Sequence, residues 1–239
     1  MLAATVATII FNGLAATGRI NGVLTDEVSN RYPTVLTPAG FAFSIWAVIY
    51  VGLVGFSIYQ LRQAKLASFR PVRILYIASC VLNCLWLWFW HQYMIGACVA
   101  VILGLLVLLL LINIRMKAIE DFADAAIGKS VYGLYFGWVT AAALINIVIL
   151  IVASGGSFSP SAWNAVGAAL LALAAMLAIL VRVKLQNYLY AIAIAWAATG
   201  IAVKQSGNTS IVIAAAFATV IGLVTAGSVV TNLKDATSE

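Results

Sequence analysis

The sequence predicts an all-α membrane protein, a polytopic transmembrane helical bundle of about eight helices. The chain of 239 residues is 64% hydrophobic and only 8% charged, and so much apolar surface cannot be solvated by water. The charged side chains lie between long apolar runs or at their ends. Most of these runs approach the roughly 20 residues that a helix needs to cross a bilayer, whereas the strands of a barrel would alternate polar and apolar residues.

Eight apolar runs define the expected spans, and the prolines support their boundaries. Pro33, Pro38, Pro71 and Pro160 stand just before or at an expected helix start, where proline is tolerated because the first turn needs no amide donor. The first and seventh runs are short for a membrane span. The expected spans are residues 2–17, 37–59, 74–91, 95–114, 131–153, 162–181, 188–203 and 211–230.

The segments between the spans indicate a division of the chain into two parts. Residues 154–161 are rich in serine and glycine, as expected for a linker. We therefore predict a five-helix transmembrane domain over residues 1–153 and a three-helix transmembrane extension over residues 161–231. In the loop before the fifth span, the acidic residues Glu120, Asp121 and Asp124 indicate a short surface helix.

The distribution of lysine and arginine predicts the orientation of the chain. Basic residues stay on the cytoplasmic side of a membrane during insertion, and eight spans leave only Arg19, Arg31 and Lys204 on the other side. We therefore expect a multi-pass integral membrane protein with both termini in the cytoplasm, or in the stroma or matrix of an organelle. The net charge of +6 then reflects topology, and no nucleic-acid partner is expected. The residues on the cytoplasmic side are Arg62, Lys65, Arg70, Arg73, Arg115, Lys117, Lys129, Arg182, Lys184 and Lys234.

Motifs for phosphate binding, zinc hydrolysis and nucleophilic catalysis are absent from the sequence, so we expect neither an enzyme nor a metal site. No charged residue lies inside an expected span and no proline interrupts one, which disfavours an ion-coupled carrier. His91 is the only histidine. We interpret it as a helix cap or a contact to lipid headgroups, in preference to an axial ligand of a tetrapyrrole metal.

Aromatic and amide side chains gather in three of the spans. Trp46 and Tyr50 lie one helical turn apart in the second span, and therefore on one face. An amide in hydrocarbon costs a few kcal/mol unless it is paired, so Asn83 of the third span and Asn146 of the fifth should face the bundle interior. Together with neighbouring aromatic residues, they would line an apolar cavity with a few fixed polar contacts, as small-molecule sites do.

Each of these features also has a purely structural interpretation. Trp88 and Trp90 lie at the exoplasmic end of the third span, where an aromatic belt is expected. Asn83 and Asn146 could equally form hydrogen bonds between helices. In the fifth span, a stripe of small residues indicates the close approach of another helix. This stripe consists of Gly133, Gly137 and Ala141.

Three motifs in order resemble the second, third and fifth helices of the TspO/MBR family, the tryptophan-rich sensory proteins related to the mitochondrial translocator protein. They are the stretch 38–50 ending in Trp-x-x-x-Tyr, the run Leu82-Asn83-x-x-Trp86, and Tyr135-x-x-Trp138 followed by Asn146. The resemblance covers the first five spans. It implies a five-helix bundle with a cavity for porphyrins, sterols and related apolar ligands, covered by the loop over residues 18–36. The ligand-binding residues that it implies are Trp46, Tyr50, Asn83, Trp86, Tyr135, Trp138 and Asn146.

Two departures from the family pattern bear on the cavity and on the last helices. The second helix of the family usually opens with a further tryptophan and a pair of prolines, where this chain has Gly40, Phe43 and Ser44. The family also normally ends after five helices, whereas this chain continues with three more expected spans.

We therefore expect a membrane receptor or carrier that binds a hydrophobic small molecule, such as a porphyrin or other tetrapyrrole or a sterol-like ligand, in an intramembrane aromatic cavity. No cofactor is certain, and the candidates are a bound tetrapyrrole or lipid. Porphyrin breakdown is disfavoured because we expect no acid or base near the cavity. The alternative is an accessory or scaffold subunit of a larger membrane complex, such as a pigment-containing photosynthetic one. The expected partners are membrane lipids, the ligand, and a second copy or a larger complex.

Overall fold

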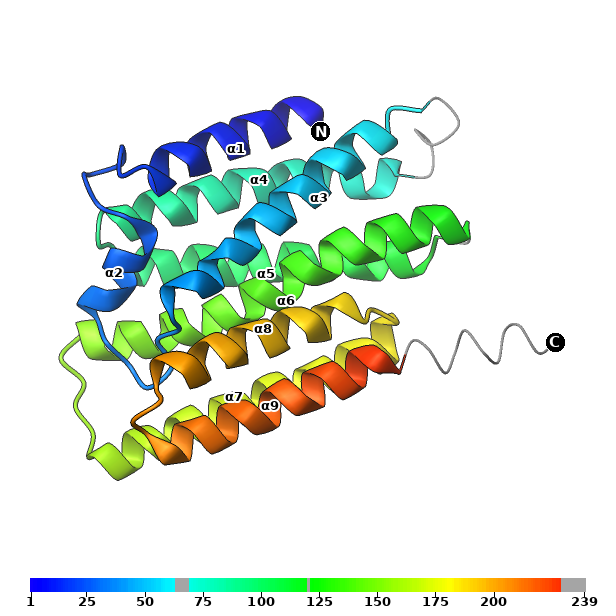
Figure 1. The fold of residues 1–239 in the computed structure, drawn as a ribbon. Helices are drawn as coiled ribbons and strands as arrows, with labels where there is room; N and C mark the ends of the chain where they lie inside the picture. Colours follow the sequence, from blue (N-terminus) through cyan, green and yellow to red (C-terminus); the bar gives the residue numbers. More distant parts are fainter. Residues whose placement is uncertain (63–68, 120, 229–239) are drawn as a thin grey trace.

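The computed structural model of this chain describes residues 1–62, 69–119 and 121–228, and these fold entirely into helices and connecting turns. Eight helices run side by side with alternating direction, and the short helix α2 lies across one end (Figure 1). The predicted all-α transmembrane bundle is confirmed. The elements are α1 (Leu2–Ala16), α2 (Thr25–Arg31), the 3-10 helix η1 (Gly40–Ser44), α3 (Ile45–Tyr59), α4 (Arg70–His91), α5 (Ile95–Lys117), α6 (Phe122–Ala153), α7 (Pro160–Leu185), α8 (Leu189–Lys204) and α9 (Thr209–Gly227).

Among the described residues, six helical segments are long and apolar enough to cross a membrane, and one of them joins η1 to α3. The helices α1 and α8 are apolar but only 15 and 16 residues long, as the short first and seventh runs of the sequence predict. The chain is a multi-pass integral membrane protein.

The start of α1 and the end of α9 lie at the same end of the bundle (Figure 1), as an even number of crossings requires. Arg70 at the start of α4 and Lys117 at the end of α5 lie at this same end. Lys65 and Lys234 lie outside the described residues. The assignment of this end to the cytoplasm stays a prediction based on the positive charges.

The fifth span begins at Phe122, earlier than the predicted residue 131. The Asp121 side chain accepts a hydrogen bond of 2.8 Å from the Asp124 amide, so Asp121 caps the helix. The predicted surface helix is therefore wrong, because Asp121 caps α6 and Asp124 lies in its first turn. Asp124 is only 1% exposed and accepts a hydrogen bond from the Tyr59 hydroxyl at 2.7 Å. Glu120 lies outside the described residues.

The second span starts as the 3-10 helix η1, because its backbone is tied to α8. The Ala39 amide donates to the Gly200 carbonyl at 2.9 Å, and the Trp196 indole donates to the Ala42 carbonyl at 2.9 Å. At Gly200 an added Cβ atom would lie 2.7 Å from that of Ala42. The helix α8 therefore fixes the segment that leads into α3.

The helix α8 lies against both α6 and α9, and glycines allow these close approaches. A Cβ atom on Gly137 of α6 would lie 2.4 Å from the Tyr190 carbonyl oxygen of α8. A Cβ atom on Gly222 of α9 would lie 2.8 Å from the Ala191 carbonyl oxygen. The close helix approach predicted from the small-residue stripe is present, and its partner is α8.

A buried amide network joins α5, α6 and the turn before α8. The Asn187 amide donates to the Asn113 side-chain oxygen at 2.7 Å and to the Lys129 carbonyl at 2.8 Å. The Asn113 amide in turn donates to the Tyr132 carbonyl at 3.2 Å. These bonds attach the last three helices to the first five. The predicted boundary between residues 1–153 and 161–231 falls at the loop between α6 and α7, and the division into two domains stays a prediction.

The packing of α8 on α6 predicts that Gly137→Ala destabilises the protein by about 1–3 kcal/mol, the usual range for an overpacked core. The added methyl group would have to push the backbone of α8 away. Thermal unfolding in one detergent checks this expectation. The matched control is Gly55→Ala in α3, where an added Cβ atom meets no atom within 4 Å and alanine favours the helix. Equal melting temperatures for the two variants would contradict the close approach.

Candidate functional site

Trp46 of α3 is the centre of an aromatic cluster between α3, α4 and α6. Its ring stacks on Tyr50 with centroids 5.5 Å apart and planes 12° from parallel. It also lies 6.3 Å from Trp86, 5.8 Å from Tyr135 and 6.2 Å from Trp138, measured between ring centroids. These distances fall within the range in which aromatic rings attract one another. Aromatic residues that are far apart in the sequence therefore form one packed group.

A chain of hydrogen bonds runs along one side of this cluster. The Asn83 amide donates to the Tyr135 hydroxyl at 3.0 Å, and the Asn83 oxygen accepts from the Asn12 amide at 2.9 Å. The Tyr50 hydroxyl donates to the Asn12 side-chain oxygen. Asn12 is not among the site residues predicted from the sequence. It is an amide inside an apolar span, as Asn83 is, and this signal would have identified it.

A second contact of an asparagine side chain joins α4 and α6. The Trp86 indole donates to the Asn146 side-chain oxygen at 3.1 Å, and the Asn146 amide donates to the Ala142 carbonyl at 2.9 Å. Both predicted asparagines therefore form hydrogen bonds between helices. The Trp138 indole N–H differs from that of Trp86, because it is buried and has no hydrogen-bond partner in the described chain.

A cavity of about 290 Å³ opens beside Trp46 and Tyr50. Its volume is at the lower end of the range for small-molecule sites. Its walls come from the helices α1, α3 and α4, from η1, and from α2 with the residue that precedes it. The lining residues are Asn12, Ala16, Leu24, Thr25, Asp26, Gly40, Phe43, Trp46, Tyr50 and Leu87.

The seven predicted site residues form one cluster, but only some of them line the cavity. Trp46 and Tyr50 line the cavity, whereas Asn83 and Tyr135 line neither the cavity nor the narrow gap next to it. This gap measures about 20 Å³ and shares Phe43 and Trp46 with the cavity wall. The lining of the gap is Ser29, Pro38, Phe43, Trp46, Trp86, Trp90, Trp138, Ala142, Ile145 and Asn146.

The segment over residues 18–36, which the resemblance identifies as a lid, contains α2 and contributes to the cavity wall. The Trp90 indole donates to the Thr25 carbonyl at 2.9 Å, and the Asn21 amide donates to the His91 carbonyl at 2.7 Å. Asp26 of α2 is half-buried and lines the cavity. The expectation of no acid near the cavity is therefore wrong, because the sequence did not show how the segment folds back.

Trp90 and His91 also differ from their predicted roles. Trp90 is 2% exposed and points inward to its partner Thr25, so the aromatic-belt interpretation is wrong for it. Trp88 is 47% exposed, as a belt residue should be. His91 is fully buried and does not reach the headgroups, and its Nδ1 lies 2.8 Å from the Leu87 carbonyl oxygen. The described residues hold no group of three or more His, Cys, Asp or Glu side chains that could bind a metal ion.

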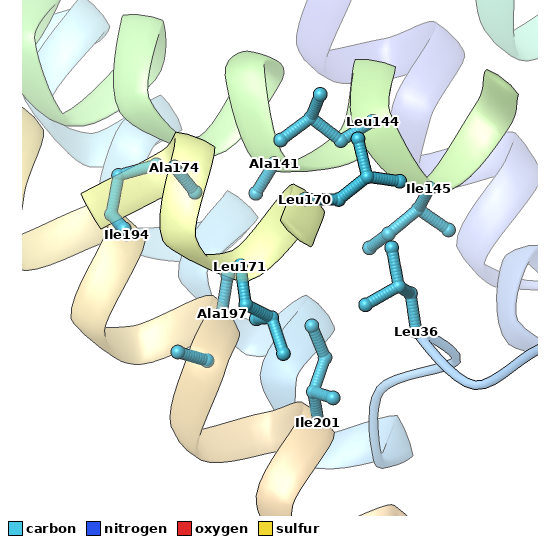
Figure 2. A pocket seen from close by; sticks show the side chains of 11 residues that line it. Leu36, Ala141, Leu144, Ile145, Leu170, Leu171, Ala174, Ile194, Ala197 and Ile201 are labelled. Atoms are coloured by element: carbon cyan, nitrogen blue, oxygen red, sulfur yellow. The ribbon is translucent and has the colours of Figure 1, made fainter. Parts of the chain in front are cut away.

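Two other hollows are less suited to an apolar ligand. A gap of about 20 Å³ lies between α6, α7 and α8. Its lining side chains, which include Leu36, are all apolar (Figure 2). It is too small for a ligand and offers no polar contact. A wider hollow of about 710 Å³ lies between residues 30–37, the α6–α7 loop and the end of α8. Its lining residues Ser157 and Lys204 are exposed to the surroundings of the protein.

Comparison with known proteins places this arrangement in a family. The family described as TSPO-like protein matches residues 1–229. The match extends beyond the five spans that carry the resemblance and includes the last three helices. No curated protein and no solved structure matches the chain. The match spans nearly the whole chain, which therefore belongs to the TSPO-like protein family.

Proposed function

We propose that the cavity beside Trp46 binds a hydrophobic small molecule, such as a tetrapyrrole or a sterol-like compound, and that the protein acts as its membrane receptor or carrier. The observation that carries this proposal is a cavity of about 290 Å³ bordered by the stacked rings of Trp46 and Tyr50. Aromatic faces contribute a large apolar contact area with a defined geometry. The Asp26 carboxylate in the same wall would orient the ligand.

The hydrogen bonds around the cavity support binding with little rearrangement of its inner wall. Tyr50 and Asn12 are held by each other, and Asn12 is also bonded to Asn83. Side chains that are already fixed lose little conformational freedom when a ligand binds. A ligand would therefore meet a preformed surface at Asn12 of α1 and Tyr50 of α3.

A ligand larger than the cavity, such as a tetrapyrrole, would have to extend past α2 or move the Trp46 indole. Trp46 and Phe43 border both the cavity and the narrow gap next to it, so rotation of the Trp46 indole would join the two spaces. The ligand would then reach the buried Trp138 N–H, which has no partner in the described chain. A buried donor without an acceptor is costly, and a ligand oxygen or nitrogen would relieve that cost.

We propose binding without chemical conversion of the ligand. Among the residues that line the cavity, only Asp26 and Tyr50 have titratable side chains. The Tyr50 hydroxyl already donates its proton to the Asn12 side chain. General acid–base catalysis needs a group that can exchange a proton with the reacting atom, and this wall offers one carboxylate without a second group to cooperate with it.

We predict that Trp46→Phe weakens binding of octaethylporphyrin, a tetrapyrrole without carboxylates, by roughly three- to tenfold, because a phenyl ring offers less stacking area than indole. Quenching of tryptophan fluorescence, measured with the protein in phosphatidylcholine nanodiscs, gives the Kd. Trp88→Phe is the matched control, because Trp88 is 47% exposed and lines neither the cavity nor the gap. If both variants bind like the wild type, the ligand does not occupy this cavity.

We further predict that Trp86→Phe and Trp138→Phe differ in their effects on stability and on porphyrin affinity. Trp86→Phe leaves the Asn146 oxygen without its donor, and should lower the free energy of unfolding by about 1–3 kcal/mol through this lost hydrogen bond. Trp138→Phe removes an N–H that has no partner, so its cost should be limited to lost packing. The affinity for porphyrin should still fall in Trp138→Phe, because the bound ligand would lose the hydrogen bond that it accepts from this N–H. Thermal unfolding and the fluorescence titration test both effects. Greater destabilisation by Trp138→Phe, with unchanged porphyrin affinity, would contradict the role given to its N–H.

A further inference from the structure

We propose that Asp26 makes the cavity selective for apolar ligands whose polar end is a cation or a hydrogen-bond donor, and against ligands that end in a carboxylate. This inference rests on the proposed binding function and adds the class of ligand to it. It makes Asp26 a specificity residue contributed by the lid.

The position of Asp26 is the first support for this role. Its side chain is half-buried and lines the cavity together with Asn12, Phe43 and Trp46. Its carboxylate has no hydrogen-bond or ion-pair partner within the described chain. A carboxylate that is partly removed from water is stabilised by a cation or a donor, and the cavity is the space where a ligand can supply one.

The absence of a balancing positive charge is the second support. The lining of the cavity contains no lysine and no arginine. At the two ends of the lid, Arg31 stacks over the Tyr93 ring, with its guanidinium carbon 4.4 Å from the ring centroid, and Arg19 is exposed. The wall is otherwise mostly apolar, so water screens the carboxylate less than it would on an open surface. A ligand cation is therefore attracted, and a ligand carboxylate is repelled.

A structural role at the start of α2 is the competing explanation, because acidic residues in the first turn stabilise a helix. Glu27 already fulfils that role, since its side chain accepts a hydrogen bond from the Leu24 amide at 2.7 Å. Glu27 is exposed and does not line the cavity. The two neighbouring carboxylates therefore differ in their surroundings, and Glu27 provides a matched control.

Three probes that share one apolar body test this charge selectivity. Pyrenebutylamine is a cation at neutral pH, pyrenebutyric acid is an anion, and pyrenebutanol is a neutral donor. Energy transfer from tryptophan to pyrene gives the Kd of each probe with the full chain in phosphatidylcholine nanodiscs. Each probe is compared only between variants, so its partition into the lipid cancels. The variants are Asp26→Asn, Asp26→Glu and Glu27→Gln.

We expect Asp26→Asn to raise the Kd of the amine roughly tenfold and to lower that of the acid, because the charge is lost while an acceptor oxygen remains. The Kd of the alcohol should change by less than roughly twofold. Asp26→Glu should retain the preference for the amine, and Glu27→Gln should change none of the three values.

Equal responses of the three probes to Asp26→Asn, or the same shift in Glu27→Gln, would overturn the role of Asp26. In that case the proposed function still stands if Trp46→Phe weakens all three probes and Trp88→Phe does not. If Trp46→Phe and Trp88→Phe bind every probe like the wild type, cavity binding itself is wrong, and the selectivity of Asp26 is wrong with it.

Discussion

Pairing of polar side chains inside the bundle is the constraint on which the rest of this structure depends. A membrane core provides no water for an exposed amide or hydroxyl group, so a group of this kind without a partner in the protein is costly. Asn12 and Asn83 meet this need between α1 and α4, while Asn113 and Asn187 meet it at the opposite end of the bundle. Hydrogen bonds of this kind fix how each helix is rotated and how far it is shifted along its neighbour.

The same pairing determines what the cavity can offer a ligand. The Asn12 amide is already shared between Asn83 and its own helix, so the strongest open polar group in the wall is the Asp26 carboxylate. The aromatic surface comes from α3 and the charge comes from the lid. The last three helices contribute indirectly, because Gly200 and Trp196 of α8 hold the segment that brings Gly40 and Phe43 to the cavity.

The sequence predicted the helices and the aromatic cluster well, because the length of an apolar run and the need to bury an amide are local properties. It placed Asn83 and Asn146 inside the bundle, where both make contacts between helices. The resemblance implied that the loop over residues 18–36 covers the cavity, but the contacts that hold this loop in place depend on distant partners such as Trp90 and His91. Trp90 was assigned to the surface because a belt residue and a buried residue have the same position at a helix end.

An experimental structure of the protein in lipid, with octaethylporphyrin bound, tests the central claim most directly. We expect density for the porphyrin next to the Trp46 ring, between α1, the lid and α3, with Asn12 and Asp26 at its edge. Density on the outer surface of α7 and α9 instead, with the space beside Trp46 filled by neighbouring side chains, would contradict the proposed ligand cavity.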